Sequence, residues 1–189
     1  MINDDALNRT IKAAVKAGLN IHVQDNVLQV IGQGWAAEIP MQRFYSTLRT
    51  TLGTLVTMLG AIPEEGDSFR IWKSKEGWDV QDMIPDTIDR QLLDGEEDRK
   101  MLVTPLYWGR WRLWQAEDGT IVGQTAGAMG MGEMPAALDN LGALRWTDYS
   151  TMERVSCTPY YPDDPEKLER WKALESVRWV WTDMPEEDT

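Results

Sequence analysis

Hydrophobic residues recur along the chain in two periods, one typical of helices and one typical of strands. The clearest helical period covers residues 41–59, where apolar side chains return every three or four positions until Gly60 ends the pattern. A shorter helix is predicted near the N-terminus, where Asn3 or Asp4 can cap it and Gly18 suits the position after its end. These two segments supply the helices of the first third.

Alternating apolar positions predict strands in the same part of the chain. Residues 20–31 alternate on either side of Gln24-Asp25-Asn26, which favours a hairpin, and residues 69–73 and 78–83 flank a second turn. The run Gly32-Gln33-Gly34 lacks the spacing and the lysine of a phosphate-binding loop, so we interpret it as a plain turn. Helices and antiparallel hairpins are therefore expected to alternate.

Residues 101–125 contain three short β-favouring runs, and we expect them to form the middle of a sheet. Tryptophans lie within these runs, and the turn Glu117-Asp118-Gly119 separates two of them as a hairpin connection would. Before this segment, residues 85–93 predict a short helix, and the charged run at 95–100 is expected to be a solvated connection.

The following segment is less regular. Residues 126–134 are rich in glycine and methionine, which fits either a mobile lid over a site or a loop packed by adaptable thioethers. Pro135 is expected to begin a short helix with Leu138 and Leu141 on one face. Residues 145–157 fit a helix or a strand equally well.

The C-terminal end returns to regular patterns. Asp164 can cap a helix, residues 177–181 alternate as a strand does, and residues 184–189 form an acidic tail that we expect to be disordered. No repeat or shift of composition marks a boundary, so residues 1–183 are predicted to form one domain. The mixture of hairpins and helices predicts an α+β fold, in which helices pack on a small mixed or antiparallel sheet.

The charge of the chain narrows the choice of partners. Lys and Arg number 19 against 31 Asp and Glu, which gives a formal net charge of -12. A surface of this charge repels phosphate over most of its area, so broad, nonspecific binding of nucleic acid is disfavoured. A local basic strip that meets DNA remains open as an alternative, and so does attraction to a basic partner protein.

Cysteine and histidine are too scarce for several kinds of site. Cys157 is the single cysteine, which excludes an internal disulfide, and His22 is the single histidine, which leaves little for a zinc site. Apolar runs are shorter than a membrane span, and residues 1–10 lack the pattern of a signal peptide. We therefore predict a soluble, cytoplasmic protein.

Catalytic candidates among these side chains are few. His22 lies in a predicted strand, and we interpret it as a structural histidine on the exposed face; we interpret Cys157 as a buried, inert thiol. Carboxylates are the remaining candidates for acid chemistry, either the pair Asp79 and Asp82 beside the hairpin or Glu38 before the long helix.

Ten tryptophans are the other unusual feature of the composition. Arg110, Arg112 and Arg178 lie beside several of them, which would suit a strip that stacks on nucleotides or single-stranded nucleic acid. A tryptophan-rich core combined with a protein-binding surface explains the same residues, and the acidic charge favours this second interpretation.

The element order between Ala37 and Met83 resembles the ParB/sulfiredoxin fold. The resemblance is carried by residues 37–41, 69–73 and 77–80, in the order strand, core helix, strand, turn, strand. That fold binds a nucleotide or phosphate near a Gly-x-x-Arg box, to which residues 107–112 (Tyr-Trp-Gly-Arg-Trp-Arg) are similar.

The matching positions of the box are Gly109 and Arg112. The resemblance implies that Arg112 contacts phosphate, as a guanidinium does well, with Arg110 and Lys100 as further contacts. No cysteine lies beside Gly109, which excludes the chemistry of sulfiredoxins.

Proteins of this fold and size include the Osa-type fertility-inhibition factors of conjugative plasmids. That resemblance implies an ATPase and DNase that uses ATP and Mg²⁺ and acts on DNA to block conjugative transfer. In that case the carboxylates singled out above, Glu38, Asp79 and Asp82, are the catalytic candidates. The alternative from composition is a noncatalytic acidic inhibitor or immunity-type protein that binds a basic surface of a partner.

Overall fold

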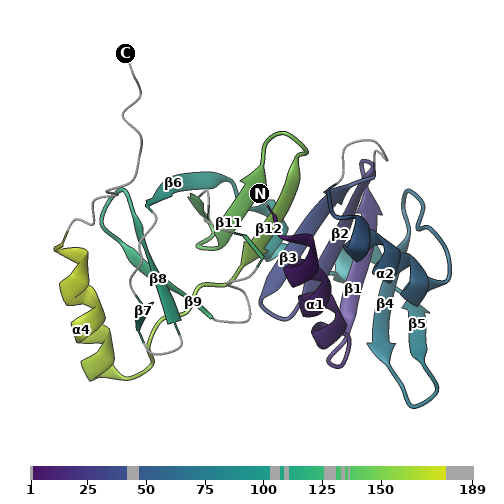
Figure 1. The fold of residues 1–189 in the computed structure, drawn as a ribbon, viewed down its shortest axis with the longest axis horizontal. Helices are drawn as coiled ribbons and strands as arrows, with labels where there is room; N and C mark the ends of the chain where they lie inside the picture. The colour runs from purple at the N-terminus through teal and green to yellow at the C-terminus, as the bar shows by residue number, and fades with distance from the viewer. Residues whose placement is uncertain are drawn as a thin grey trace.

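A computed structural model describes residues 2–41, 47–102, 107–108, 111–125, 131–132, 135 and 137–177. Within this part of the chain, one sheet of 12 strands dominates, and every strand pair in it is antiparallel. Figure 1 shows the strands following one another along the long axis of the molecule.

The strands of the sheet are β1 Leu19–Gln24, β2 Val27–Gly32, β3 Trp35–Pro40, β4 Ser68–Lys73, β5 Trp78–Asp82, β6 Glu97–Leu102, β7 Tyr107–Trp108, β8 Trp111–Ala116, β9 Ile121–Thr125, β10 Ala137–Asp139, β11 Leu144–Asp148 and β12 Glu153–Cys157. The helices are α1 Asp4–Ala14, α2 Arg49–Leu59, α3 Gln91–Asp94 and α4 Pro165–Glu175, with a 3₁₀ turn, η1, at Pro85–Thr87. The order of the strands across the sheet is β5-β4-β1-β2-β3-β12-β11-β10-β6-β8-β7, and β9 pairs with β8.

This architecture contradicts the predicted α+β fold with a small sheet. The helices of the described residues are short, and the large antiparallel sheet carries most of the core, so the protein is largely a β-sheet protein. Two segments account for the difference: the charged run expected as a connection forms β6, and the helix expected after Pro135 is strand β10. The ambiguous segment 145–157 is a hairpin, because Trp146 and Val155 lie opposite each other and are both buried.

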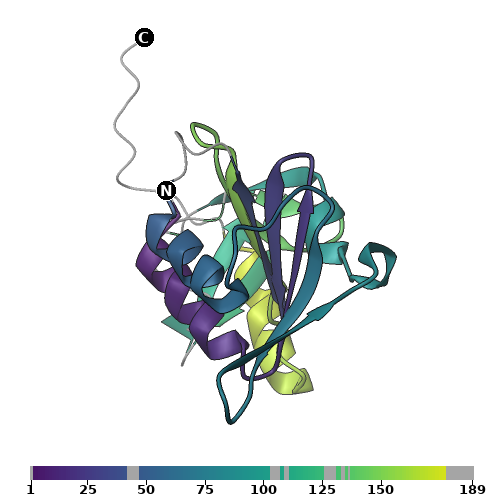
Figure 2. The ribbon, with the colours of Figure 1, turned by 90° about the vertical axis from the view of Figure 1, so that its right-hand side faces the viewer.

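Helices α1 and α2 lie side by side on one face of the sheet (Figure 2). Asn3 caps α1 by accepting the N–H of Ala6 at 3.0 Å, and the carboxylate of Asp4 then accepts the N–H groups of Thr50 and Thr51 at the start of α2. This carboxylate links the start of α1 to the start of α2.

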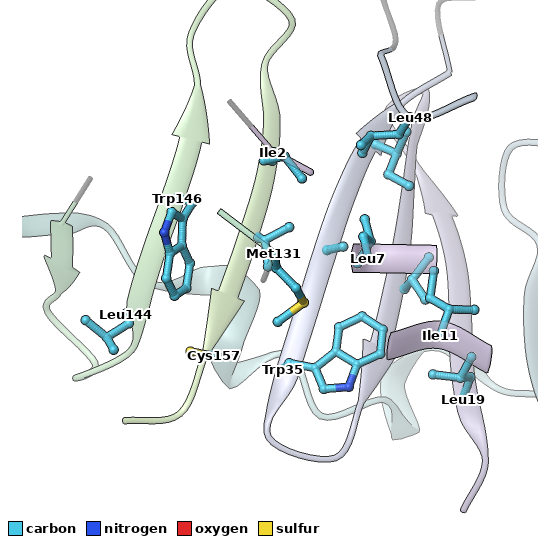
Figure 3. Packing of buried hydrophobic residues seen from close by; sticks show 14 of the residues in the cluster. Ile2, Leu7, Ile11, Leu19, Trp35, Leu48, Met131, Leu144, Trp146 and Cys157 are labelled. Atoms are coloured by element: carbon cyan, nitrogen blue, oxygen red, sulfur yellow. The ribbon is translucent and has the colours of Figure 1, made fainter. Parts of the chain in front are cut away.

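The main core lies between these helices and the sheet. It extends from Leu7 and Ile11 of α1 through Val30 and Val155 to Trp114 of β8, so a single apolar cluster reaches from the first helix to the far strands. In Figure 3, Met131 projects between Trp146 and Trp35 in this cluster. Met131, a described residue of the methionine-rich segment 126–134, is therefore part of the core. The two alternatives for this segment, a lid over a site or a packed loop, also depend on residues 126–130 and 133–134, which lie outside the described residues.

A second layer covers β9 at the other end of the molecule. Asp164 caps α4 as predicted, and Trp171 of α4 is buried against Leu113 and Ile121, with its indole N–H donating to the Ile121 carbonyl at 3.1 Å. Figure 1 shows α4 beside β8 and β9, away from α1 and α2. The residues predicted as the last strand and tail, 178–189, lie outside the described residues.

Several local predictions are confirmed. The first helix, the hairpin around residues 24–26, the turn at Gly32-Gln33-Gly34, the hairpin of β4 with β5 and the hairpin of β8 with β9 form as expected. The long helix is described from Arg49 onward, since residues 42–46 are outside the described range. Residues 101–125 are not the middle of the sheet, because β7, β8 and β9 lie at one end of the strand order.

Candidate functional site

The three carboxylates predicted to be catalytic lie on two separated strands. Glu38 is on β3, whereas Asp79 and Asp82 are on β5, four strand steps away in the sheet order. At about 4.8 Å per strand, this separation is roughly 19 Å. Asp79 and Asp82 are also three residues apart on one strand, so their side chains point to opposite faces. The geometry does not bring these three side chains together.

Glu38 belongs to a row of polar side chains that crosses six strands on the face opposite α1 and α2. One carboxylate oxygen lies 3.1 Å from an Arg154 Nη1 atom, and the other accepts the Gln29 side-chain amide at 3.4 Å. The members of the row are directly opposite one another on neighbouring strands: Ser68, His22, Gln29, Glu38, Arg154 and Thr147. Each side chain in this row has a neighbour on the next strand, which explains how polar groups are accommodated inside a sheet.

His22 is buried in this row, which corrects the expectation that it lies on an exposed face. Its Nδ1 atom lies 2.7 Å from the Ser68 hydroxyl and 3.1 Å from the Asp67 carbonyl oxygen. A nucleophilic serine needs a histidine that accepts its proton and a route for substrate. Both Ser68 and His22 are 6% exposed, so this pair has no access for substrate, and we assign it a structural role.

Cys157 is buried and free, as predicted. Burial raises the pKa of its thiol to about 12, so the reactive thiolate is disfavoured at neutral pH.

The predicted phosphate-binding residues are separated as well. Lys100 is on β6 and exposed, and its carbonyl accepts the N–H of Glu117, which follows the end of β8 and is five residues after Arg112. At about 3.4 Å per residue, the backbone positions of Lys100 and Arg112 are roughly 17 Å apart along the strand direction. Gly109 and Arg110 lie outside the described residues.

Arg112 packs on an aromatic ring. Its guanidinium carbon lies 4.3 Å from the centroid of Trp114, which is fully buried and donates its indole N–H to Gln124 at 2.9 Å. The Gly-x-x-Arg box runs into strand β8 and opens no helix, so the helix N-terminus that commonly binds phosphate is missing at this point.

A pocket of about 500 Å³ lies among the described residues, and sequence reasoning did not identify it. It opens where the end of α1, the β2–β3 turn, the start of α3 and the β10–β11 turn meet, with Arg70 of β4 on its wall. The sequence contains little indication of this pocket, because the residues that line it come from segments far apart in the chain. In the sequence, Arg70 is only one residue of the predicted strand 69–73.

The walls of this pocket are held by a buried ion pair. An Arg145 Nη2 atom lies 2.9 Å from an Asp139 carboxylate oxygen, and both side chains are almost fully buried. Asp139 also accepts the N–H groups of Leu141 and Ala143 in the β10–β11 turn, at 3.0 and 2.7 Å. Burial lowers the pKa of Arg145, as does the nearby charge of Arg154, while Asp139 raises it.

The second unassigned feature is the outer edge of the sheet at β5. All five of its residues are exposed, and β4 is its one strand partner among the described residues. Trp78 and Val80 expose apolar surface there, and Ile84 follows just after the strand. Residues 76–89 carry five carboxylates and no lysine or arginine.

Within the described residues, no group of three or more His, Cys, Asp or Glu side chains is placed to hold a metal ion. No helix in that part of the chain is long and apolar enough to span a membrane. Comparison with protein-family models, with curated proteins and with solved structures finds no match for this chain.

Proposed function

We propose that this protein is a noncatalytic binding protein that captures a basic, extended segment of a partner protein along the open edge of β5. The observation that carries this proposal is the combination, on one strand, of a backbone edge that has no strand partner among the described residues, acidic side chains and exposed apolar side chains. Edge strands of this kind bind peptides by adding them to the sheet as a further strand.

The hydrogen-bond register shows which backbone groups are free for such pairing. Met83 donates its N–H to the Ser68 carbonyl at 2.9 Å, and Ser74 donates to the Gly77 carbonyl at 3.0 Å. Because inward and outward groups alternate along an antiparallel strand, Asp79 and Gln81 face β4. Trp78, Val80 and Asp82 therefore direct their N–H and C=O groups away from the sheet, where a partner strand can meet them.

The charge of the segment selects the kind of partner. All five carboxylates of residues 76–89 belong to exposed residues, and the chain as a whole carries a net charge of -12. Opposite charges directly across a strand pair contribute about 0.2–1 kcal/mol each, and a charged surface speeds the encounter with an oppositely charged partner. The same charge opposes pairing of β5 with a second copy of this chain.

The exposed apolar side chains add a second requirement. Trp78 and Val80 lie on the same face of the sheet as α1 and α2, because Val80 is opposite the buried Ile71. Asp79 and Gln81 point to the other face. The preferred segment therefore places lysine or arginine near Asp79 on this second face, and apolar residues near Trp78 and Val80 on the first face, where a further basic residue can meet Asp82.

The test is an array of extended heptapeptides of graded charge and alternation, probed with the purified protein at low and high salt. We expect binding to be enriched among basic, alternating sequences and to weaken as salt rises. Val80→Pro removes an outward N–H and leaves the bonds to β4 intact, so it should weaken binding by about tenfold or more. Val80→Ala keeps that N–H and should retain most of the affinity.

A matched charge control separates the local surface from the net charge. Asp79→Asn/Asp82→Asn and Asp163→Asn/Glu169→Gln each remove two exposed carboxylates, but the second pair lies at α4, away from β5. The proposal predicts that the first double variant loses binding and the second keeps it. Equal effects of the two double variants, or selection of acidic peptides, would contradict the proposal.

The nucleotide-hydrolysing hypothesis from the ParB/sulfiredoxin resemblance stays a prediction. The separation of Glu38 from Asp79, and of Lys100 from Arg112, gives it less support than the β5 edge gives to partner binding. Binding of ATP with Mg²⁺ that is lost in Arg112→Ala would revive it.

A further inference from the structure

We propose that the pocket beside Arg70 binds a small organic ligand through its oxyanion group, a phosphate or a carboxylate. The pocket is a site separate from the β5 edge, and its volume of about 500 Å³ is in the usual range for small-molecule sites. The inference does not depend on the proposed function.

Arg70 supplies the charge for such a ligand. It has no ion-pair or hydrogen-bond partner among the described residues, and, unlike the equally unpaired Arg9, Arg49 and Arg170, it lines this pocket. A guanidinium that is left unpaired on a pocket wall can bind a phosphate or carboxylate through two parallel hydrogen bonds. Arg70 is therefore the anchor for the oxyanion.

Gly18 holds this guanidinium at the pocket. A Cβ atom at Gly18 would lie 3.0 Å from the Arg70 Nε atom and 3.2 Å from its Nη2 atom, so the guanidinium packs against the bare backbone after α1. Gly18 has a φ of +102°, which favours glycine independently of this contact. The close approach restricts where the guanidinium can point.

Uncharged polar side chains complete the lining. Asn20, Gln33, Gln91 and Thr158 all line the pocket, and none of their side chains makes a hydrogen bond within the described part of the chain. Four free amide and hydroxyl groups are suited to the neutral part of a ligand that carries hydroxyl or ring nitrogen atoms. These four side chains give the pocket polar groups in addition to the positive charge of Arg70.

Asp89 narrows the choice of ligand further. Its carboxylate lines the pocket and accepts the N–H of Gln91 at 3.0 Å. With one cation and one carboxylate, the site suits a ligand with a single anionic group at one end and hydrogen-bond donors elsewhere. A sugar phosphate or a hydroxy acid has this character; a polyanion does not.

The pocket is rigid enough to bind without large rearrangement. The Asp139–Arg145 ion pair fixes the β10–β11 turn, and the Leu92 carbonyl accepts from the same guanidinium at 3.4 Å. On the opposite wall, Thr158 donates its N–H to the Gly34 carbonyl at 2.9 Å. Walls that are held in place before binding reduce the entropy that binding costs.

The test is a two-dimensional NMR titration of the intact protein with four probes: ribose 5-phosphate, ribose, inorganic phosphate and lactate. We expect saturable shifts of the Gly18, Gly32 and Gly142 amides, with an anionic probe that has a hydroxylated body binding more tightly than ribose or inorganic phosphate. Ribose 5-phosphate and lactate distinguish a phosphate site from a carboxylate site.

Variants assign the effect to Arg70. Arg70→Gln should weaken binding by about tenfold or more, and Arg70→Lys should retain part of it. Arg9→Gln is the matched control, since Arg9 is an exposed arginine of α1 outside the pocket lining. All variants should keep the thermal unfolding midpoint of the wild type, because both arginines are exposed.

Three outcomes would overturn the proposal: no saturable binding of any probe, equal losses in Arg70→Gln and Arg9→Gln, or shifts that lie outside the pocket. A Val80→Pro variant that still binds the probe, together with an Arg70→Gln variant that still binds basic peptides, would show that this site and the β5 edge act independently.

Discussion

Replacing Asp139 by asparagine should destabilise the protein far more than the same change at a surface carboxylate. Asp139 and Arg145 have side chains that are 0% and 2% exposed, and their charged atoms lie 2.9 Å apart. Asparagine can still accept the two turn N–H groups, but it leaves the Arg145 charge buried without a counter-charge. Losing one partner of a buried ion pair costs about 3–5 kcal/mol.

The expected cost lies at the lower end of this range. Arg145 keeps three other acceptors, namely the carbonyl oxygens of Gly95 and Leu92 and the hydroxyl of Ser156. These groups solvate part of the unpaired charge, so we expect a loss of about 3 kcal/mol in the free energy of unfolding. The additional change Arg145→Met should recover part of it, because no unpaired charge then remains.

Asp118 provides the matched control. Its carboxylate lies 3.1 Å from an Arg99 Nη1 atom, but the two side chains are 44% and 31% exposed. Asp118→Asn should therefore cost less than about 1 kcal/mol. Urea unfolding of both variants at neutral pH measures the difference, provided that the dependence on urea concentration is unchanged. Equal costs, or a loss below about 1 kcal/mol for Asp139→Asn, would refute the argument from burial.

Three further predictions concern single residues. Burial alone would raise the pKa of Asp4, but hydrogen bonds from Thr51 and Thr50 outweigh it and hold that pKa below its ordinary value. Its stabilising contribution is therefore present above the unfolded pKa and lost as pH falls through the folded pKa, so wild type and Asp4→Asn should converge in stability towards acid pH. Cys157 should react with a thiol reagent at pH 8 only after denaturation; rapid labelling of the native protein would contradict its burial. Gly53→Ala should stabilise α2 by about 0.5–1 kcal/mol in thermal unfolding, since nothing lies within 4 Å of the added Cβ, and a destabilised variant would show a hidden contact.

Local features of this fold could be predicted from sequence because their causes are local. Asn3 and Asp164 cap their helices through side chains next to the helix start, and the β8–β9 hairpin turns at Asp118 and Gly119. In each case a few neighbouring residues determine the conformation, so no knowledge of distant segments is needed.

Strands β6 and β10 could not be predicted in this way. β6 contains four charged residues in a row, which is typical of a solvated loop, but β10 and β8 pair with it on its two sides, and Arg99 finds a partner in Asp118. β10 has three residues, and its Asp139 is buried because Arg145 on the next strand neutralises it. Tertiary pairing outweighs local propensity in both strands.

The candidate sites depend on strand order, which periodicity does not reveal. Arg70 and Gly18 are more than fifty positions apart in the sequence and meet only because β4 pairs with β1. Similarly, the acidic run after Gly77 was recognisable as a strand, but only the sheet order shows that it is an edge. The burial of His22 was missed for the same reason, since its partners are on β4 and in the preceding loop.

Amide hydrogen exchange tests the proposed strand addition most directly. With the best basic peptide from the array bound, the outward N–H groups of Trp78, Val80 and Asp82 should become protected, while Asp79 and Gln81, already bonded to β4, should change little. Protection that follows this alternation would support binding by strand addition. Binding that leaves the three outward amides unprotected, or protects another surface instead, would contradict it.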